Sequence, residues 1–216
     1  MGIAYNTSLV TNGLIMYVDA ANPRSYPGTG NTWYDLSGNN NHMTLVNGVG
    51  FSTSYGGVLQ TDGTNDYIEH LTFNQNTTNH TIMGASRYSG SARGRIFSAI
   101  NNNWLLGHWN NQNPAYYAEG WIVGPGSGNN NNWQISTGVE NYSSDVWSYY
   151  LNGTLLASNS SGSQGPNGLS FGHWRPGGLT AELSTAEISF FMVYNRLLTA
   201  DEIKQNYNAI KKRFGY

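Results

Sequence analysis

Val146–Ser158, with the sequence VWSYYLNGTLLAS, predicts two antiparallel β-strands joined by a two-residue turn. Asn152 and Gly153 suit the two positive φ angles that a type I′ turn requires. Trp147 and Tyr149 are separated by one residue, so they fall on the same face of the first strand. The stretch therefore predicts a hairpin with one face turned toward a core.

Further strand-length runs occur on both sides of this hairpin, each bounded by Gly-, Asn- or Ser-rich turn sequences. They are Leu14–Val18, Val58–Gln60, Tyr67–His70, Thr81–Tyr88, Arg95–Ile100, Trp104–Trp109, Ala115–Val123, Trp133–Thr137, Leu169–Trp174 and Ala186–Tyr194. Many short strands separated by turn signals are typical of an all-β sandwich.

One helix is expected, at about residues 199–213. Thr199 and Glu202 form a capping-box pair at its start. Four apolar residues follow at spacings of four, three and four, namely Ile203, Tyr207, Ile210 and Phe214. This stripe predicts that the helix packs against a sheet face or edge. No linker sequence interrupts the chain, so we expect a single domain over residues 1–216 that ends with this helix.

The composition excludes several classes of protein and of site. The chain has 216 residues, 10% of them charged, a formal net charge of −2 and no cysteine. Disulfides, thiolate nucleophiles and cysteine-ligated metals are therefore absent. Without a basic excess, nucleic acid is not an expected partner. The apolar run Leu14–Val18 is too short to span a membrane.

Three blocks of sequence carry a resemblance to a known family. They are the segments Asn12–Ala20, Trp33–His42 and Asp62–Ile68 taken together, the hairpin Trp147–Ser158, and the segment Phe190–Ile203. The chain resembles the laminin-G-like, concanavalin A-type jelly-roll family. In Asp19–Gly28 (DAANPRSYPG) it is similar to free-standing members found in tailed bacteriophages. The resemblance implies an all-β, concanavalin A-like (laminin-G-like) jelly-roll β-sandwich with one C-terminal α-helix.

The resemblance also implies a function. We expect a non-enzymatic structural protein on the outer surface of a bacteriophage head, neck or tail. It would contact other virion proteins and could bind cell-surface glycans as an adhesin. A stand-alone carbohydrate-binding lectin and a glycoside hydrolase are the alternatives. The near-neutral, tyrosine-rich surface suits a homo-oligomer.

Catalytic signatures are missing from the sequence. Glycosidases related in fold carry carboxylates two residues apart on one strand, because two acids must face the same cleft. None of the twelve Asp and Glu residues has another at that spacing. The histidines show no zinc-hydrolase spacing, although His108 and His173 each lie between a Gly and a Trp and could form a metal pair if their strands were neighbours. We therefore expect no enzyme activity.

Aromatic and amide side chains concentrate between residues 104 and 133. A sugar needs an aromatic surface for its apolar face and polar groups for its hydroxyls. The candidate carbohydrate-binding residues are Trp109, Asn111, Tyr116, Tyr117, Trp121 and Trp133. The alternative is that the aromatic residues pack in the inter-sheet core and the asparagines form turns.

Asp62, Asn65 and Asp66 are the candidate metal ligands. Their oxygens suit Ca²⁺, which some loops of this family bind. The alternative is a turn in which an Asp side chain accepts hydrogen bonds from its own backbone. No other cofactor is expected.

Overall fold

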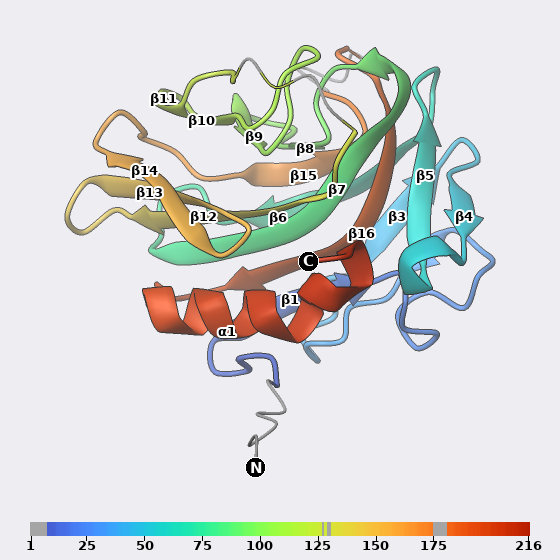
Figure 1. Ribbon diagram of the computed structural model, residues 1–216, viewed down its shortest axis with the longest axis horizontal. Helices are drawn as coiled ribbons and strands as arrows, with labels where there is room; N and C mark the ends of the chain where they lie inside the picture. The colour runs from blue at the N-terminus through green and yellow to red at the C-terminus, as the bar shows by residue number, and fades with distance from the viewer. Residues whose placement is uncertain (1–7, 127, 129–130, 175–180) are drawn as a thin grey trace.

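The computed structural model describes residues 8–126, 128, 131–174 and 181–216, which form two facing antiparallel sheets and one α-helix (Figure 1). Across the first sheet, the order is β14 (Thr154–Asn159), β13 (Val146–Leu151), β12 (Gln134–Asn141), β7 (His80–Arg93), β16 (Ser184–Tyr194), β5 (Val58–Asp62) and β4 (Gly50–Ser52), and β1 (Leu14–Asp19) also pairs with β16. Across the second sheet, it is β11 (Trp121–Val123), β10 (Tyr116–Ala118), β9 (Trp104–Leu106), β8 (Phe97–Ser98), β15 (Asn167–Phe171), β6 (Tyr67–Asn74), β3 (Met43–Val46) and β2 (Thr32–Trp33). This is the predicted jelly-roll β-sandwich with a C-terminal helix.

The central strands of the first sheet are buried on both faces. Its inner face packs against the second sheet in a core that includes Trp147 and Tyr149 of the predicted hairpin. Its outer face packs against α1 (Ala200–Ile210) and the short 3₁₀ helix η3 (Lys211–Phe214). Two separate hydrophobic cores therefore share one sheet.

A β-bulge in β16 changes which residues of this long central strand face each core. Ala186 and Ile188 point into the inter-sheet core, whereas Phe190 points toward α1. The register against β7 shifts between Ile188 and Phe190, so the alternation of faces changes by one residue there. Phe191 returns to the inter-sheet core.

The turn and the helix form as their sequences predict. Asn152 and Gly153 have φ angles of 52° and 71°, and β13 pairs with β14. Thr199 and Glu202 make both hydrogen bonds of the capping box. The four residues of the apolar stripe are all buried against the outer face of the first sheet.

No helix among the described residues has the length and apolarity to cross a bilayer.

Two sequence predictions of strands need correction. Ala115–Val123 was expected as one strand but forms β10 and β11, which pair as a hairpin. Glu119 takes a positive φ of 56° at the turn, and a Cβ on Gly120 would lie 1.7 Å from the Ser161 carbonyl oxygen. The Glu-Gly pair is therefore an overlooked turn signal. Of Arg95–Ile100, only β8 is strand, and the short strands β2, β3 and β4 were missed.

The segment Asp19–Gly28 has a structural role at the C-terminal helices. Asp19 is buried, and Arg213 of η3 donates to its carboxylate at 2.9 Å. Arg213 also donates to the hydroxyl of Ser189 at the β16 bulge, at 2.6 Å. These contacts hold the C-terminal end of the helical segment against the first sheet.

Candidate functional site

An open cleft of about 540 Å³ lies where the C-terminal end of β7 meets the loop after β9 and the start of β16. Its described lining consists of Ser91, Arg93, Gly94, Trp109, Asn110, Asn111, Glu182 and Leu183. We call it the rim cleft. Figure 1 shows the β8–β11 loops on the side of the sandwich away from α1. The cleft volume is within the range of small-ligand sites.

An ion pair lies beside the rim cleft, with Glu182 in its lining. Arg95 is 4% exposed, and its Nε donates to Glu182 Oε2 at 2.6 Å. The indole N–H of Trp109 donates to the same oxygen at 2.9 Å. Burial lowers the pKa of Arg95, while the hydrogen bond that Arg95 donates to Glu182 opposes that shift. Glu182 thus fixes both the guanidinium and the orientation of Trp109.

The Gly-His-Trp sequence occurs twice, and both copies meet at this ion pair. Trp109 belongs to the first copy, residues 107–109, and contacts Glu182. Trp174 belongs to the second, residues 172–174, and its ring lies 4.1 Å from the guanidinium carbon of Arg95. A guanidinium over an indole face is a favourable cation–π contact. The short sequence repeat therefore supplies two aromatic walls for one charged pair.

A group of partly exposed aromatic rings continues from Trp109. The rings of Trp109 and Trp121 are 5.4 Å apart, and those of Trp121 and Tyr117 are 4.9 Å apart. Asn111 is exposed, and its Oδ1 accepts from Arg93 at 3.1 Å. The cleft thus combines aromatic surface with amide and guanidinium groups.

Backbone conformations that are rare outside glycine cluster in the lining. Asn110, Asn111 and Glu182 have φ angles of 47°, 65° and 49°. Asparagine tolerates this region, whereas a glutamate there costs free energy that the surrounding contacts must offset. Arg95 and Trp109 supply those contacts for Glu182. Such strain is common in binding and catalytic sites.

Four of the six predicted sugar-binding residues come together, and two do not. Trp109, Asn111, Tyr117 and Trp121 lie at or beside the rim cleft. Tyr116 must be removed from the set, because it is fully buried between the sheets and donates to Glu140 at 2.5 Å. Burial and the nearby Glu140 raise the pKa of its phenol.

Trp133 must also be separated from this group. It lies on the outer face of the first sheet, where its ring is 4.6 Å from that of Phe214. It borders a second cleft, described below. Of the asparagine run before it, residues 129 and 130 lie outside the described residues.

The candidate calcium residues form a turn that satisfies its own polar groups. The Oδ1 of Asp62 accepts from the backbone amides of Thr64, Asn65 and Asp66 at 2.7, 3.2 and 3.4 Å. Asp66 is 5% exposed, and burial raises the pKa of its carboxyl. The Asn65 carbonyl accepts from the side chain of Asn47. Asp62 Oδ1 and the Asn65 carbonyl oxygen are thus engaged by protein donors, and the described residues contain no group of three or more acidic or histidine side chains suited to a metal.

The two histidines before the tryptophans have separate packing partners. His108 Nδ1 lies 3.3 Å from the Ser86 hydroxyl, and its ring meets Tyr88 edge-on. His173 stacks on Tyr67 with 4.1 Å between ring centroids. Both are buried within the sandwich. Their geometry suits packing and gives no support to a metal pair.

The central residues of the rim cleft are not identified by the sequence patterns. Arg95 falls in a predicted strand, and Glu182 has no carboxylate at the spacing that a glycosidase strand requires. The two residues are 87 positions apart, so no local pattern joins them. The repeated Gly-His-Trp sequence is the one signal that connects the two parts of the chain that meet at this ion pair.

Comparisons with known proteins indicate a shared fold. No protein-family model matches the chain, and no curated protein matches it. Among solved structures, a Trypanosoma rangeli sialidase mutant with trans-sialidase activity superposes with a TM-score of 0.70 at 15% identity, over 97% of this chain and 35% of the sialidase. The likeness is one of fold.

Two toxin domains show the same likeness. The binding domain of Paraclostridial Mosquitocidal Protein 1 has a TM-score of 0.64 at 16% identity. The receptor binding domain of a botulinum neurotoxin C/D mosaic serotype has a TM-score of 0.67 at 18% identity. Each match covers 92% of this chain and 52% of the toxin domain. The chain therefore spans about a third to a half of these neighbours.

Proposed function

We propose that the protein is a non-catalytic carbohydrate-binding module and that the rim cleft is its binding site. The observation that carries the proposal is the fixed orientation of Trp109, whose indole N–H is held by Glu182 at 2.9 Å beside the ring of Trp121. Rigid aromatic surfaces bind the apolar faces of sugars without a large loss of side-chain entropy.

Polar groups around the aromatic surface suit sugar hydroxyls. The exposed residues Asn110 and Asn111 carry amides that both donate and accept, and Arg93 carries a fork of donors. The toxin neighbours are binding domains by description, which agrees with a recognition role at the level of fold.

We propose no catalytic activity because the described lining of the cleft lacks a pair of carboxylates. A glycosidase needs two of them across the cleft, about 5–9.5 Å apart. Glu182 is the single carboxylate in the described lining, and it is bound to Arg95 and Trp109. One carboxylate cannot supply both of the acidic groups that this chemistry requires.

A glycan array with the whole chain, followed by calorimetry on the strongest hit, tests this function. Trp109→Ala and Trp121→Ala should each weaken binding about tenfold or more, because each removes stacking surface. Tyr34→Ala is the matched control, since Tyr34 is an exposed aromatic residue outside the rim cleft. Array binding that is absent, or equally strong in the Trp variants, would reject the proposal.

The location that we propose for this module is the outer surface of a bacteriophage particle, in contact with other virion proteins. The observation that favours it is the resemblance of Asp19–Gly28 to free-standing bacteriophage members of the jelly-roll family. Mass spectrometry of purified particles should detect the chain at a fixed ratio to the capsid or tail proteins. Its absence from the particles would reject the location and leave the sugar-binding proposal intact.

A further inference from the structure

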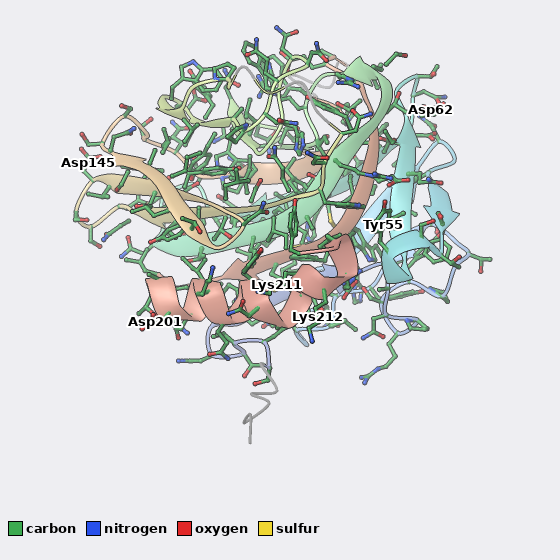
Figure 2. All side chains as sticks on the ribbon, in the orientation of Figure 1. Tyr55, Asp62, Asp145, Asp201, Lys211 and Lys212 are labelled. Atoms are coloured by element: carbon green, nitrogen blue, oxygen red, sulfur yellow. The ribbon has the colours of Figure 1, made fainter. Side chains whose placement is uncertain are left out.

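A second cleft, of about 370 Å³, lies on the outer face of the first sheet beside η3. Its described lining is Tyr55, Arg87, Asn131, Asn132, Trp133, Phe214 and Tyr216. We call it the outer cleft. Figure 2 shows Tyr55 between the C-terminal end of the helical segment and β5.

Tyr55 is held in a strained conformation at the edge of this cleft. Its φ and ψ are 55° and 26°, a left-handed conformation that is an outlier for a bulky residue. Gly56 and Gly57 follow with φ angles of 82° and 148°. A Cβ on Gly57 would lie 2.3 Å from the Ala20 carbonyl oxygen, so the loop is packed closely on its neighbour. The fold therefore maintains a conformation that costs about 1–3 kcal/mol.

Tyr55 lies at the edge of the core on the outer face of the first sheet, not within it. Trp133 and Phe214 are buried and contribute to the packing of α1 and η3 on the sheet. Tyr55 is 37% exposed and belongs to neither hydrophobic core. Its ring meets Trp133 edge-on at 5.2 Å. Tyr55 thus extends the aromatic wall of the outer cleft into solvent.

Arg87 fixes the position of this wall. Its guanidinium carbon lies 4.9 Å from the Tyr55 ring centroid and 5.4 Å from that of Trp133. Glu187 holds the guanidinium through Nε at 2.7 Å and in turn accepts from Gln60 at 2.9 Å. The Arg213 Nε also lies 3.4 Å from the Tyr55 carbonyl oxygen. The wall is therefore preorganised, as a binding surface should be.

The two clefts share one segment of chain. Asn131 Oδ1 accepts from Arg93 of the rim cleft at 2.7 Å, while Asn131, Asn132 and Trp133 line the outer cleft. Arg87 and Arg93 lie six residues apart on β7. The register of β7 against β16 shifts between Tyr88 and Arg93, and the two clefts adjoin through Asn131.

We propose that the outer cleft is a second saccharide subsite, in which a pyranose ring stacks on Tyr55 while the Asn131 and Asn132 amides and the Arg87 guanidinium contact its hydroxyls. The inference rests on the proposed function, because it assigns the same ligand class to a second place. Two linked subsites on one strand would bind a long or branched glycan more tightly than a single sugar.

Indole ¹H–¹⁵N resonances of the full chain report on the two clefts separately. The seven tryptophans give seven indole signals, which Trp→Phe substitutions assign. The probes are methyl glycosides of glucose, galactose, mannose and N-acetylglucosamine. A saturable shift of the Trp133 signal that persists in Trp109→Ala would support the outer subsite.

Variants of Tyr55 separate stacking from folding. Tyr55→Gly should weaken binding at Trp133 about tenfold, the loss expected for one stacked ring. It should still fold, because glycine adopts a φ of 55° without strain. Tyr55→Phe keeps the ring and should retain binding.

The remaining outcomes overturn the inference in distinguishable ways. Shifts at Trp109 and Trp121 without any at Trp133 would reject the outer subsite and leave the proposed function standing. A Trp133 shift that is unchanged in Tyr55→Gly would reject stacking on Tyr55 and with it the subsite as described. No shift at any tryptophan would count against both proposals.

Discussion

His108 is a buried side chain that makes the stability of the protein depend on pH. It directly precedes Trp109 and is fully buried against Ser86 and Tyr88. Burial lowers its pKa to about 3, so the ring is neutral in the folded protein. In the unfolded chain a histidine takes up a proton near pH 6.5. Folding is therefore linked to the loss of this proton below neutral pH.

The folded protein should lose stability as the pH falls from about 6.5 toward 3, because the unfolded chain then binds a proton that the folded protein does not. Between pH 7 and pH 4.5 the loss should be about 2–3 kcal/mol. Phe at this position does not titrate, so His108→Phe should flatten the pH dependence by that amount. Urea unfolding of both proteins across this range measures the difference.

Other titrating groups cancel in this comparison. Burial also lowers the pKa of His70, but His70 is present in both proteins. Arg196 lowers the pKa of Glu202 to about 2, so that carboxylate contributes mainly below pH 4.5. Parallel stability curves for the two proteins would contradict the assignment of a buried neutral His108.

The position of α1 is decided by the elements that it meets. Three separate pieces of chain fix α1 and η3. The hairpin turn at Gly153 lies against Tyr207 of α1, whereas the β16 bulge binds Arg213 of η3 through Ser189 and the loop at Tyr55 meets Phe214 of η3. The helix thus joins segments that are distant in sequence. Its apolar stripe supplies the free energy of docking, and these contacts select where it docks.

The contact between the hairpin turn and the helix gives a test of this view. A Cβ on Gly153 would lie 2.8 Å from the Tyr207 ring, so Gly153→Ala adds a clash to the cost of a positive φ. Gly38 has a similar φ of 90°, and a Cβ there would meet nothing within 4 Å, which makes Gly38→Ala the matched control. The control should lose about 1–2 kcal/mol, and Gly153→Ala should lose about 1–3 kcal/mol more.

Thermal and urea unfolding would measure both variants. Equal losses of stability would show that the turn does not press on the helix. A larger loss in Gly153→Ala that is relieved by Tyr207→Ala would locate the coupling at this pair.

Across the whole molecule, the two clefts lie on different surfaces, and the Asp62 turn lies near the rim cleft. A Cβ on Gly63 would touch Ala92, next to two residues of the rim lining. Figure 2 shows Asp62 at the end of β5 away from α1. An ion bound at this turn would lie close to the proposed sugar-binding cleft. Whether the Asp62 carboxylate binds an ion or only backbone amides therefore bears on the proposed function.

Calcium should therefore leave the protein unchanged. Because Asp62 already accepts three backbone amides, excess Ca²⁺ and EDTA should give the same Tm and the same glycan affinity. Asp62→Asn should retain most of the stability, since the Asn oxygen can accept from the same amides. A saturable rise in Tm with Ca²⁺, absent with Mg²⁺ and abolished in Asp62→Asn, would contradict this prediction.

The sequence was most informative where the signal is local. The turn at Asn152 and Gly153 and the capping box of Thr199 depend on backbone needs within a few residues, and both form as predicted. The fold class follows from many such signals and from the family resemblance. Tyr116 and Tyr117 show what the sequence could not predict. Neighbours on a strand point to opposite faces, and the sequence does not say which face is covered.

By itself, the sequence determined the hairpin, the helix with its apolar stripe and the all-β sandwich, because turn chemistry, capping and periodicity act over a few residues. Only the tertiary structure decided which aromatic rings reach solvent and which groups surround them. Arg95 and Glu182 meet because β7 and β16 lie side by side in the sheet. Tyr55 reaches Trp133 because two distant loops converge on the helix. Contacts of this kind depend on the path of the whole chain, which no local pattern specifies.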